Sequence, residues 1–218
     1  MNWRDREVSE GQRTHEWFQA RVACLTASQA HLVLQRLKNG QRSQKAKDYI
    51  TEIVAERLTG KVVEKYVSYF MDLGNEREPE ARKAYEKQFQ CMIQPVGFIL
   101  HPNIKWFGAS PDGVIDEEIG VEFKCPQSST HVEYLTGQCE MIEGVPAEYI
   151  SQCDAGMACL ELDRWIFASY HPDMPKHLQF YSVDLRRNEK RIAELEYGVV
   201  EFLNEVDAVL EKLPKEAA

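Results

Sequence analysis

The sequence predicts an α/β fold in which helices flank a central mixed β-sheet. Helical patterns fill the first part of the chain, β-rich segments follow in its middle, and both types recur toward its end. This order is typical of a layered α/β domain and argues against a repeat or coiled-coil protein. The 218 residues are 44% hydrophobic and contain no Pro/Gly/Ser-rich linker, so we expect one domain, residues 1–218, around one core.

Periodicity and turn signals predict the individual elements. Apolar periodicity with start and stop signals, such as Gly60, predicts helices at residues 14–22, 28–37, 44–58 and 67–88. Segments rich in β-forming residues predict strands at residues 92–100, 104–109 and 120–125. The same signals predict helices at residues 132–142 and 146–160 and strands at residues 165–170 and 178–183.

A long amphipathic helix is expected over about residues 186–213. Its apolar residues recur every three or four positions: Ile192, Leu195, Val199, Phe202, Val206 and Val209. Between residues 194 and 211 it carries several acids and no base. By contrast, residues 35–47 contain no acidic residue, which is typical of a basic loop. Their five basic residues are Arg36, Lys38, Arg42, Lys45 and Lys47.

Three residues in the middle of the chain are candidate catalytic residues. Asp112 stands in a Pro-Asp-Gly turn, and Glu122 and Lys124 follow on a predicted strand. Residues two apart share one face of a strand, so Glu122 and Lys124 point together while Phe123 points into the core. If residues 106–110 form a strand that ends in the turn, Asp112 reaches the same end of the sheet.

Such a cluster suits the hydrolysis of a phosphodiester. Mg²⁺ prefers hard oxygen ligands, often one or two carboxylates with water and phosphate oxygens, and the backbone carbonyl of Phe123 can add a third protein ligand. Beside the ion, a lysine can position or deprotonate the attacking water while the metal stabilises the developing charge. Each half of the pattern also has an ordinary explanation, since Pro-Asp-Gly is a common turn and Glu-x-Lys is often a solvated ion pair. Together they favour a metal-dependent nuclease.

The chain resembles the bacteriophage lambda-type alkaline exonucleases, a viral recombinase family of the restriction-endonuclease-like superfamily with its Pro-Asp…Glu-x-Lys motif. The resemblance runs in order from Trp17 to Gln152. The segments that carry it are Trp17-Phe18-Gln19-Ala20-Arg21, Leu25-Thr26-Ala27-Ser28, Leu73-Gly74-Asn75-Glu76-Arg77-Glu78, Ser110-Pro111-Asp112-Gly113, Val121-Glu122-Phe123-Lys124-Cys125-Pro126 and Tyr149-Ile150-Ser151-Gln152.

The resemblance implies a restriction-endonuclease-like core and a Mg²⁺-dependent 5′→3′ exonuclease. Whether Mn²⁺ can replace Mg²⁺ stays open. Its substrate would be the ends of linear double-stranded DNA. Its products would be 5′-mononucleotides and 3′ single-stranded overhangs for recombination by strand annealing. The same resemblance implies a ring-shaped homotrimer, a single-strand annealing protein as partner, and a phage or prophage origin.

The resemblance also implies roles for single residues. Asp112 and Glu122 would be metal ligands, Lys124 would activate or orient the water, and Gln152 would lie near the nucleophile. Glu78 would be a further acid near the metal, and only the similarity favours it over Glu76.

Arg21 would hold the 5′-phosphate of the DNA, with Thr26, Ser28 and Ser110 as further phosphate contacts. Without the family, Arg21 would be an ordinary solvated arginine. Ser28 begins a predicted helix, so its hydroxyl is expected as an N-cap whatever the function. Helix N-terminal amides also bind phosphate, and both interpretations of Ser28 stay open.

The net charge of −9 is unusual for a protein that grips DNA, because phosphate contacts favour an electropositive face. A separation of the two charged segments would resolve this. The basic loop would line a central channel, with Arg42 and Lys45 in contact with DNA, and the acidic helix would face outward. The alternative is that residues 35–47 form only a soluble, flexible loop.

The six cysteines are scattered without metal-ligand spacing, which is typical of reduced thiols. No apolar run approaches the ~20 residues needed to cross a bilayer, and the N-terminus has no signal-peptide core. We therefore expect no membrane partner and a cytoplasmic protein, in the host cell if a phage encodes it.

Two other functions remain open. A structure- or site-specific DNA endonuclease of the same fold would cut closed circular DNA. A non-catalytic DNA-end-binding protein would bind without Mg²⁺-dependent cleavage, but it has no need for the acid, acid and lysine set, because like charges held close together are unfavourable without a cation.

Overall fold

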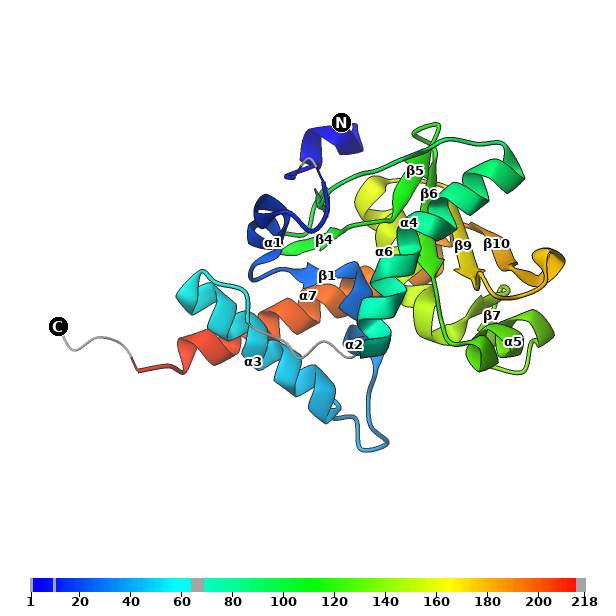
Figure 1. Cartoon of the computed structure of the whole chain (residues 1–218). Coiled ribbons are helices and arrows are strands. Elements are labelled where there is room, and N and C mark those ends of the chain that lie inside the picture. Colours follow the sequence, from blue (N-terminus) through cyan, green and yellow to red (C-terminus); the bar gives the residue numbers. More distant parts are fainter. Residues whose placement is uncertain (1, 10, 64–68, 215–218) are drawn as a thin grey trace.

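The structure, a computed structural model, describes residues 2–9, 11–63 and 69–214, without the side chains of residues 69–76 (Figure 1). The helices are α1 (His15–Arg21), α2 (His31–Leu34), α3 (Gln44–Thr59), α4 (Tyr69–Phe89), α5 (Ser128–Thr136), α6 (Ala147–Leu160) and α7 (Glu189–Glu211). Three short 3-10 turns are η1 (Trp3–Arg6), η2 (Ala27–Gln29) and η3 (Lys176–Leu178). No helix in these described ranges is long and apolar enough to span a membrane.

A mixed sheet of five strands lies at the centre, in the order β10 (Phe180–Arg186), β9 (Arg164–Tyr170), β6 (Ile119–Lys124), β5 (Gly113–Ile115) and β2 (Ile93–Gln94). The β6 and β9 strands are parallel, with Glu122 opposite Phe167, and the other pairs are antiparallel. The expected α/β fold with a central mixed sheet flanked by helices is confirmed.

A second sheet has three strands, in the order β1 (Leu25–Thr26), β4 (Phe107–Ala109) and β3 (Ile99–Leu100). A small hairpin of β7 (Met141–Ile142) and β8 (Val145–Pro146) precedes α6. The chain passes from β4 of the second sheet to β5 of the central sheet through residues 110–112 alone. This short link contains Asp112, so it places that side chain where the two sheets meet.

The two faces of β6 have different surroundings. Phe123 is buried with Tyr85 of α4, and their ring centroids are 5.6 Å apart. Glu122 and Lys124 project from the other face, toward α6. The alternation of side chains along a strand therefore separates an apolar face from a polar one.

The larger hydrophobic core lies between the sheets and helices α3, α6 and α7. In Figure 1 α3 crosses α7, and the ring centroids of Tyr49 on α3 and Phe202 on α7 lie 5.9 Å apart. The apolar stripe of α7 faces this core, as expected from its period.

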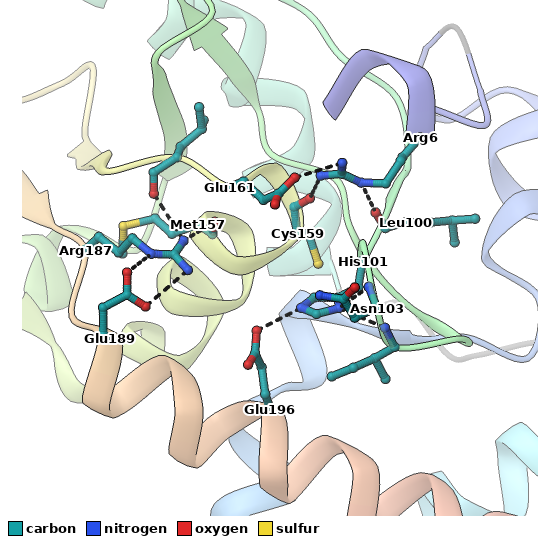
Figure 2. Close-up of polar contacts among 12 residues, drawn as sticks. Arg6, Leu100, His101, Asn103, Met157, Cys159, Glu161, Arg187, Glu189 and Glu196 are labelled. Carbon is teal, nitrogen blue, oxygen red and sulfur yellow. Dashed lines mark hydrogen bonds and ion pairs between the residues drawn. The ribbon is translucent and has the colours of Figure 1, made fainter. Parts of the chain in front are cut away.

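Arginines hold the C-terminal end of α6 from two sides (Figure 2). Arg6 donates to the carbonyl of Cys159, and Arg187 donates to the carbonyl of Met157, each at 2.8 Å. The last carbonyls of a helix lack intrahelical partners and carry partial negative charge, so cationic donors stabilise them. Arg6 also pairs with Glu161, which ends α6 in the left-handed region. These contacts fix the helix that carries Gln152.

Several expected boundaries are wrong. The expected helix at residues 28–37 is a 3-10 turn followed by the short α2, because the chain extends at Gln35 and turns back at Gly40, whose φ is +79°. The expected strand at residues 92–100 is two strands that pair with different sheets. Gly97 lies between them, where a Cβ would meet the backbone oxygen of Ser9 at 1.8 Å.

The helix expected at residues 132–142 begins earlier, at Ser128, and ends before Gly137, which takes the left-handed C-cap conformation. Strand β5 had no sequence signal, because three residues of strand are too few to show a period. Part of the helix expected at residues 67–88 falls on residues 67 and 68, which lie outside the described ranges.

Candidate active site

Asp112 and Glu122 meet at the junction between the two sheets. The backbone N–H of Asp112 donates to the carbonyl of Val121 on β6, and Oδ2 of Asp112 accepts from the backbone N–H of Phe123. The N–H and C=O of one strand residue point to the same side. The carbonyl of Phe123 therefore faces the side on which Asp112 lies.

Glu122, Lys124 and Gln152 form a closed triangle of hydrogen bonds. Nζ of Lys124 lies 2.7 Å from Oε1 of Glu122 and 3.2 Å from Oε1 of Gln152. The amide nitrogen of Gln152 donates to the same oxygen of Glu122. Gln152 comes from α6 and the other two from β6, so the triangle joins the helix to the central strand.

Burial shifts the pKa values of all three charged groups. Asp112 and Glu122 are 8% and 4% exposed. Burial raises the pKa of Asp112, and the nearby carboxylates of Glu122 and Glu78 raise it further. Burial also raises the pKa of Glu122, although Lys124 opposes this. For Lys124, burial favours the neutral amine, but the carboxylates of Glu122 and Asp112 prevail and raise its pKa. Lys124 is thus an ammonium that donates hydrogen bonds.

The donor set fits a divalent cation. The raised pKa values of the two buried carboxylates mean that too little positive charge surrounds their ionised forms. A bound cation would supply that charge. Within the part of the chain that the structure describes, no three His, Cys, Asp or Glu side chains gather closely enough to hold a metal ion by themselves. Mg²⁺ is commonly coordinated by such a set of two carboxylates and one backbone carbonyl, completed by water and phosphate oxygens.

Glu78 lies near this centre but is held by arginines. Its Oε2 is 2.7 Å from Nη2 of Arg13, and its Oε1 is 3.9 Å from Nη2 of Arg82. Arg82 also donates to the backbone carbonyl of Asp112. Glu78 is close enough to raise the pKa values of Asp112 and Glu122. The side chain of Glu76 lies outside the described residues, so the choice between the two acids stays a prediction.

Arg21 lies at the other end of the site, on α1. Its guanidinium carbon is 4.1 Å from the ring centroid of Trp17, and its Nη1 donates to Oγ of Ser110 at 3.3 Å. Nε1 of Trp17 donates to the same hydroxyl at 2.9 Å. Burial lowers the pKa of Arg21. A stacked, desolvated guanidinium suits an anion such as phosphate.

Ser28 differs from the expected helix cap. It lies inside the turn η2, and its hydroxyl is 3.2 Å from that of Thr26. Neither η2 nor α2 has a side-chain cap hydrogen bond, so the N-cap interpretation is wrong. The side chain of Ser28 is exposed, whereas Thr26 is buried.

A cavity of about 20 Å³ joins the two ends of the site. Its polar lining residues are Arg21, Ser28, Ser110, Glu122, Gln152 and Trp165. The structure therefore brings three of the predicted phosphate contacts, Arg21, Ser28 and Ser110, together with two of the predicted catalytic residues, Glu122 and Gln152. Thr26 lines a different, larger cavity beside Arg21.

The basic loop and the acidic helix are not separated, and this expectation is wrong. Arg42 is 5% exposed, and its guanidinium contacts Oε1 of Glu205 on α7 at 2.7 Å. It also donates to the carbonyl of Val33. Arg36 pairs with Glu201 on the same helix. Opposite charges attract across the short distance between loop and helix, so Arg42 is buried against α7 in an ion pair with Glu205 and is not an exposed basic side chain. Lys45 is exposed on the first turn of α3.

Two aromatic residues of the site had no predicted role. Nζ of Lys124 lies 4.8 Å from the ring centroid of Tyr149, which stacks on Phe167. The ring of Trp17 stacks against the guanidinium of Arg21, as described above. Helical spacing was the available signal, because Tyr149 precedes Gln152 by three residues and Trp17 precedes Arg21 by four, which places each pair on one helix face.

The chain is similar to known proteins in both sequence and fold. The sequence matches the YqaJ-like viral recombinase domain over residues 16–163. The structure is similar to an alkaline exonuclease, LHK-Exo, from Laribacter hongkongensis, with a TM-score of 0.79 and 34% identity, over 91% of this chain and 95% of that chain. LHK-Exo in complex with dAMP gives a TM-score of 0.80 at the same identity and coverage. A phage-related exonuclease from Haemophilus somnus 129PT shares the fold at 14% identity, with a TM-score of 0.67 over 88% of this chain and 96% of that chain.

Proposed function

The chain belongs to the YqaJ-like viral recombinase family as an alkaline-exonuclease-like DNA nuclease, and we propose that it is a Mg²⁺-dependent 5′→3′ exonuclease. It acts on the ends of linear double-stranded DNA, releases 5′-mononucleotides and leaves 3′ single-stranded overhangs. The observation that carries this proposal is the hydrogen-bonded triangle of Glu122, Lys124 and Gln152 beside the buried carboxylate of Asp112.

In this proposal Asp112, Glu122 and the carbonyl of Phe123 hold the metal. When bound, Mg²⁺, or Mn²⁺ in its place, supplies Lewis-acid stabilisation of the charge that develops on the phosphate. The side chains of the protein orient the attacking water. The Lys124 ammonium donates to the attacking water and fixes its direction, and Gln152 keeps both Glu122 and Lys124 in place. Glu78 adds negative charge next to Asp112 and so favours a cation there.

The 5′ end of the DNA is recognised by its phosphate. Arg21 gives a charged, stacked donor, and Ser28 and Ser110 give hydroxyls around the same small cavity. Anchoring the end there fixes which phosphodiester bond reaches Asp112 and Glu122. Recognition of an end and not of a base sequence favours an exonuclease.

Family membership is the support for three further parts of the proposal. The active form is a ring-shaped homotrimer that encloses duplex DNA. A single-strand annealing protein takes over the 3′ overhang for recombination. The protein works in the cytoplasm, which is that of the host if a phage or prophage encodes it.

The test measures cleavage of linear duplex DNA that is labelled at the 5′ or the 3′ end. A closed circular DNA and a single-stranded DNA are the comparison substrates, and each is incubated with Mg²⁺ or with EDTA. We expect Mg²⁺-dependent release of the 5′ label as mononucleotide, with the circle spared. Release of the 3′ label first would reverse the direction, cutting of the circle would make the protein an endonuclease, and binding without cleavage would make it an end-binding protein.

A further inference from the structure

The cavity between the phosphate end and the carboxylate end contains one group without a role so far. Trp165, on β9, is 1% exposed and forms part of the cavity lining. Its backbone is paired with Gly120 of β6, two residues before Glu122 on the same face. The indole therefore lies directly beside the residues that we assign to catalysis.

Two glycines make room for this indole. A Cβ added to Gly120 or to Gly156 of α6 would lie 2.2 Å from carbon atoms of the Trp165 ring. Real Cβ atoms do not approach so closely, so the indole fills the space that both side chains would need. The ring is held between the central strand and the helix that carries Gln152. Its orientation is fixed by packing.

The indole N–H of Trp165 has no hydrogen-bond partner in the described residues, and its nitrogen is shielded from solvent. The other polar side chains of the cavity have partners: Arg21 and Ser110 with each other, Ser28 with Thr26, and Glu122 with Gln152. Buried donors are nearly always satisfied, because an unmade hydrogen bond there is unfavourable. Among the residues that line this cavity, the unpartnered indole N–H of Trp165 points to a donor that a ligand completes.

We propose that the N–H of Trp165 donates to a non-bridging oxygen of the 5′-terminal phosphate of bound DNA, as a further specificity-determining contact. The inference rests on the proposed function, since it deepens the phosphate site of Arg21, Ser28 and Ser110. A cavity of about 20 Å³ has room for one oxygen-sized group, not for a whole phosphate. An indole donor carries no charge and never ionises, so it adds direction without changing the charge balance beside Glu122.

Nuclear magnetic resonance of the intact protein with ¹⁵N-labelled tryptophan tests this directly. The chain has four tryptophans, and the single variants Trp3→Phe, Trp17→Phe and Trp106→Phe assign three indole signals, which leaves the fourth to Trp165. A short blunt duplex is added in EDTA, so that nothing is cleaved. One duplex carries 5′-phosphates and the matched duplex carries 5′-hydroxyls.

The expected result is a downfield shift of the Trp165 N–H with the phosphorylated duplex and not with the hydroxyl duplex. Trp3, whose Nε1 donates to the carbonyl of Glu117, should stay unchanged. Trp17 reports on the anchor independently, since its Nε1 donates to Ser110. Movement of the Trp17 signal without that of Trp165 would overturn the Trp165 contact and leave the anchor standing. Movement of neither would remove the anchor, and with it the contact.

A kinetic comparison gives a second readout. Trp165→Phe keeps an aromatic ring and removes the N–H, so the preference of kcat/KM for 5′-phosphorylated over 5′-hydroxyl ends should fall about tenfold or more. Trp3→Phe is the matched control and should keep the wild-type preference. An unchanged preference in a folded Trp165→Phe variant would reduce the indole to a packing group.

Discussion

Nζ of Lys124 lies 2.7 Å from Oε1 of Glu122, the residue two positions earlier on the same strand. The contact keeps the lysine charged and turned toward the carboxylates. In this position Lys124 stays protonated, so it donates hydrogen bonds and does not act as a base. A group that orients water acts mainly in the transition state, and this decides how its removal should appear in kinetics.

Lys124→Ala should lower kcat by about 10²–10⁴-fold and leave DNA affinity within a few-fold of wild type, because in the proposed mechanism the lysine directs the water and does not hold the DNA. Single-turnover cleavage and binding in EDTA measure the two quantities. Lys83→Ala, on an exposed position of α4, is the matched control for removal of one positive charge. Near-normal turnover of the Lys124 variant would take the residue out of the mechanism.

Asp112→Asn should raise the Mg²⁺ concentration needed for activity or abolish activity, since a neutral amide is a poorer ligand than a carboxylate. Without metal, the same change should stabilise the protein by about 0.5–2 kcal/mol, because burial and two neighbouring acids disfavour the ionised form of Asp112. Magnesium titrations of activity and denaturant unfolding in EDTA check the two halves. An unchanged magnesium titration contradicts the ligand assignment.

Arg21→Ala should reduce the preference for 5′-phosphorylated over 5′-hydroxyl ends by about tenfold, the value of one charged hydrogen bond. Arg21→Lys should restore only part of it, because an ammonium cannot stack on Trp17 as a planar guanidinium does. The ratio of kcat/KM on the two substrates is the measurement. If all three proteins give the same ratio, the 5′-phosphate is anchored elsewhere.

Arg42 and Lys45 should behave differently although they are close in sequence. Arg42→Ala should lower the free energy of unfolding by about 1–3 kcal/mol and leave the salt dependence of DNA binding unchanged, because its guanidinium is used by Glu205 and Val33. Lys45→Ala should leave stability unchanged and reduce the slope of log Kd against log salt by about 1 if it contacts a phosphate. A reduced slope for Arg42→Ala would mean that the ion pair opens to bind DNA.

Acid should destabilise the protein partly through His131. This residue is fully buried; its Nε2 donates to the carbonyl of Leu178 and its Nδ1 lies 2.7 Å from Oγ of Ser169. Burial lowers its pKa. Below about pH 6.5, the usual pKa of histidine, the unfolded chain binds a proton that the folded chain does not, so stability falls as pH falls.

His131→Gln should therefore lower stability by about 1 kcal/mol at neutral pH and flatten the loss between neutral and mildly acidic pH. Urea unfolding across this range is the measurement. His177→Gln, at an exposed position, should keep the wild-type profile. A His131 variant with the same pH slope as wild type would assign the acid sensitivity to other buried groups.

The central features of the fold and site were predictable because local rules govern them. Strand alternation predicted that Glu122 and Lys124 share a face, and the turn at Asp112 predicted its approach to them. The placement of Arg42 was not predictable from its segment, since only the folded chain brings residues 35–47 against α7. The split of residues 92–100 between two sheets depends on partners far away in sequence. The stacking of Lys124 on Tyr149 also needed the packing of α6 on β6.

Under the proposed function, the link of residues 110–112 sets the length of DNA that is removed in each step. Ser110 lies with Arg21 at the end of one sheet, and Asp112 lies with Glu122 beside the other, with only Pro111 between them. Under the proposed function, the span from the bound 5′-phosphate to the phosphodiester bond that is cut is set by this three-residue link and not by any feature of the DNA. One nucleotide per step is then a property of the chain itself. An added glycine after Pro111 should yield dinucleotides or uneven products, and chromatography of the released nucleotides would reveal the change in step size.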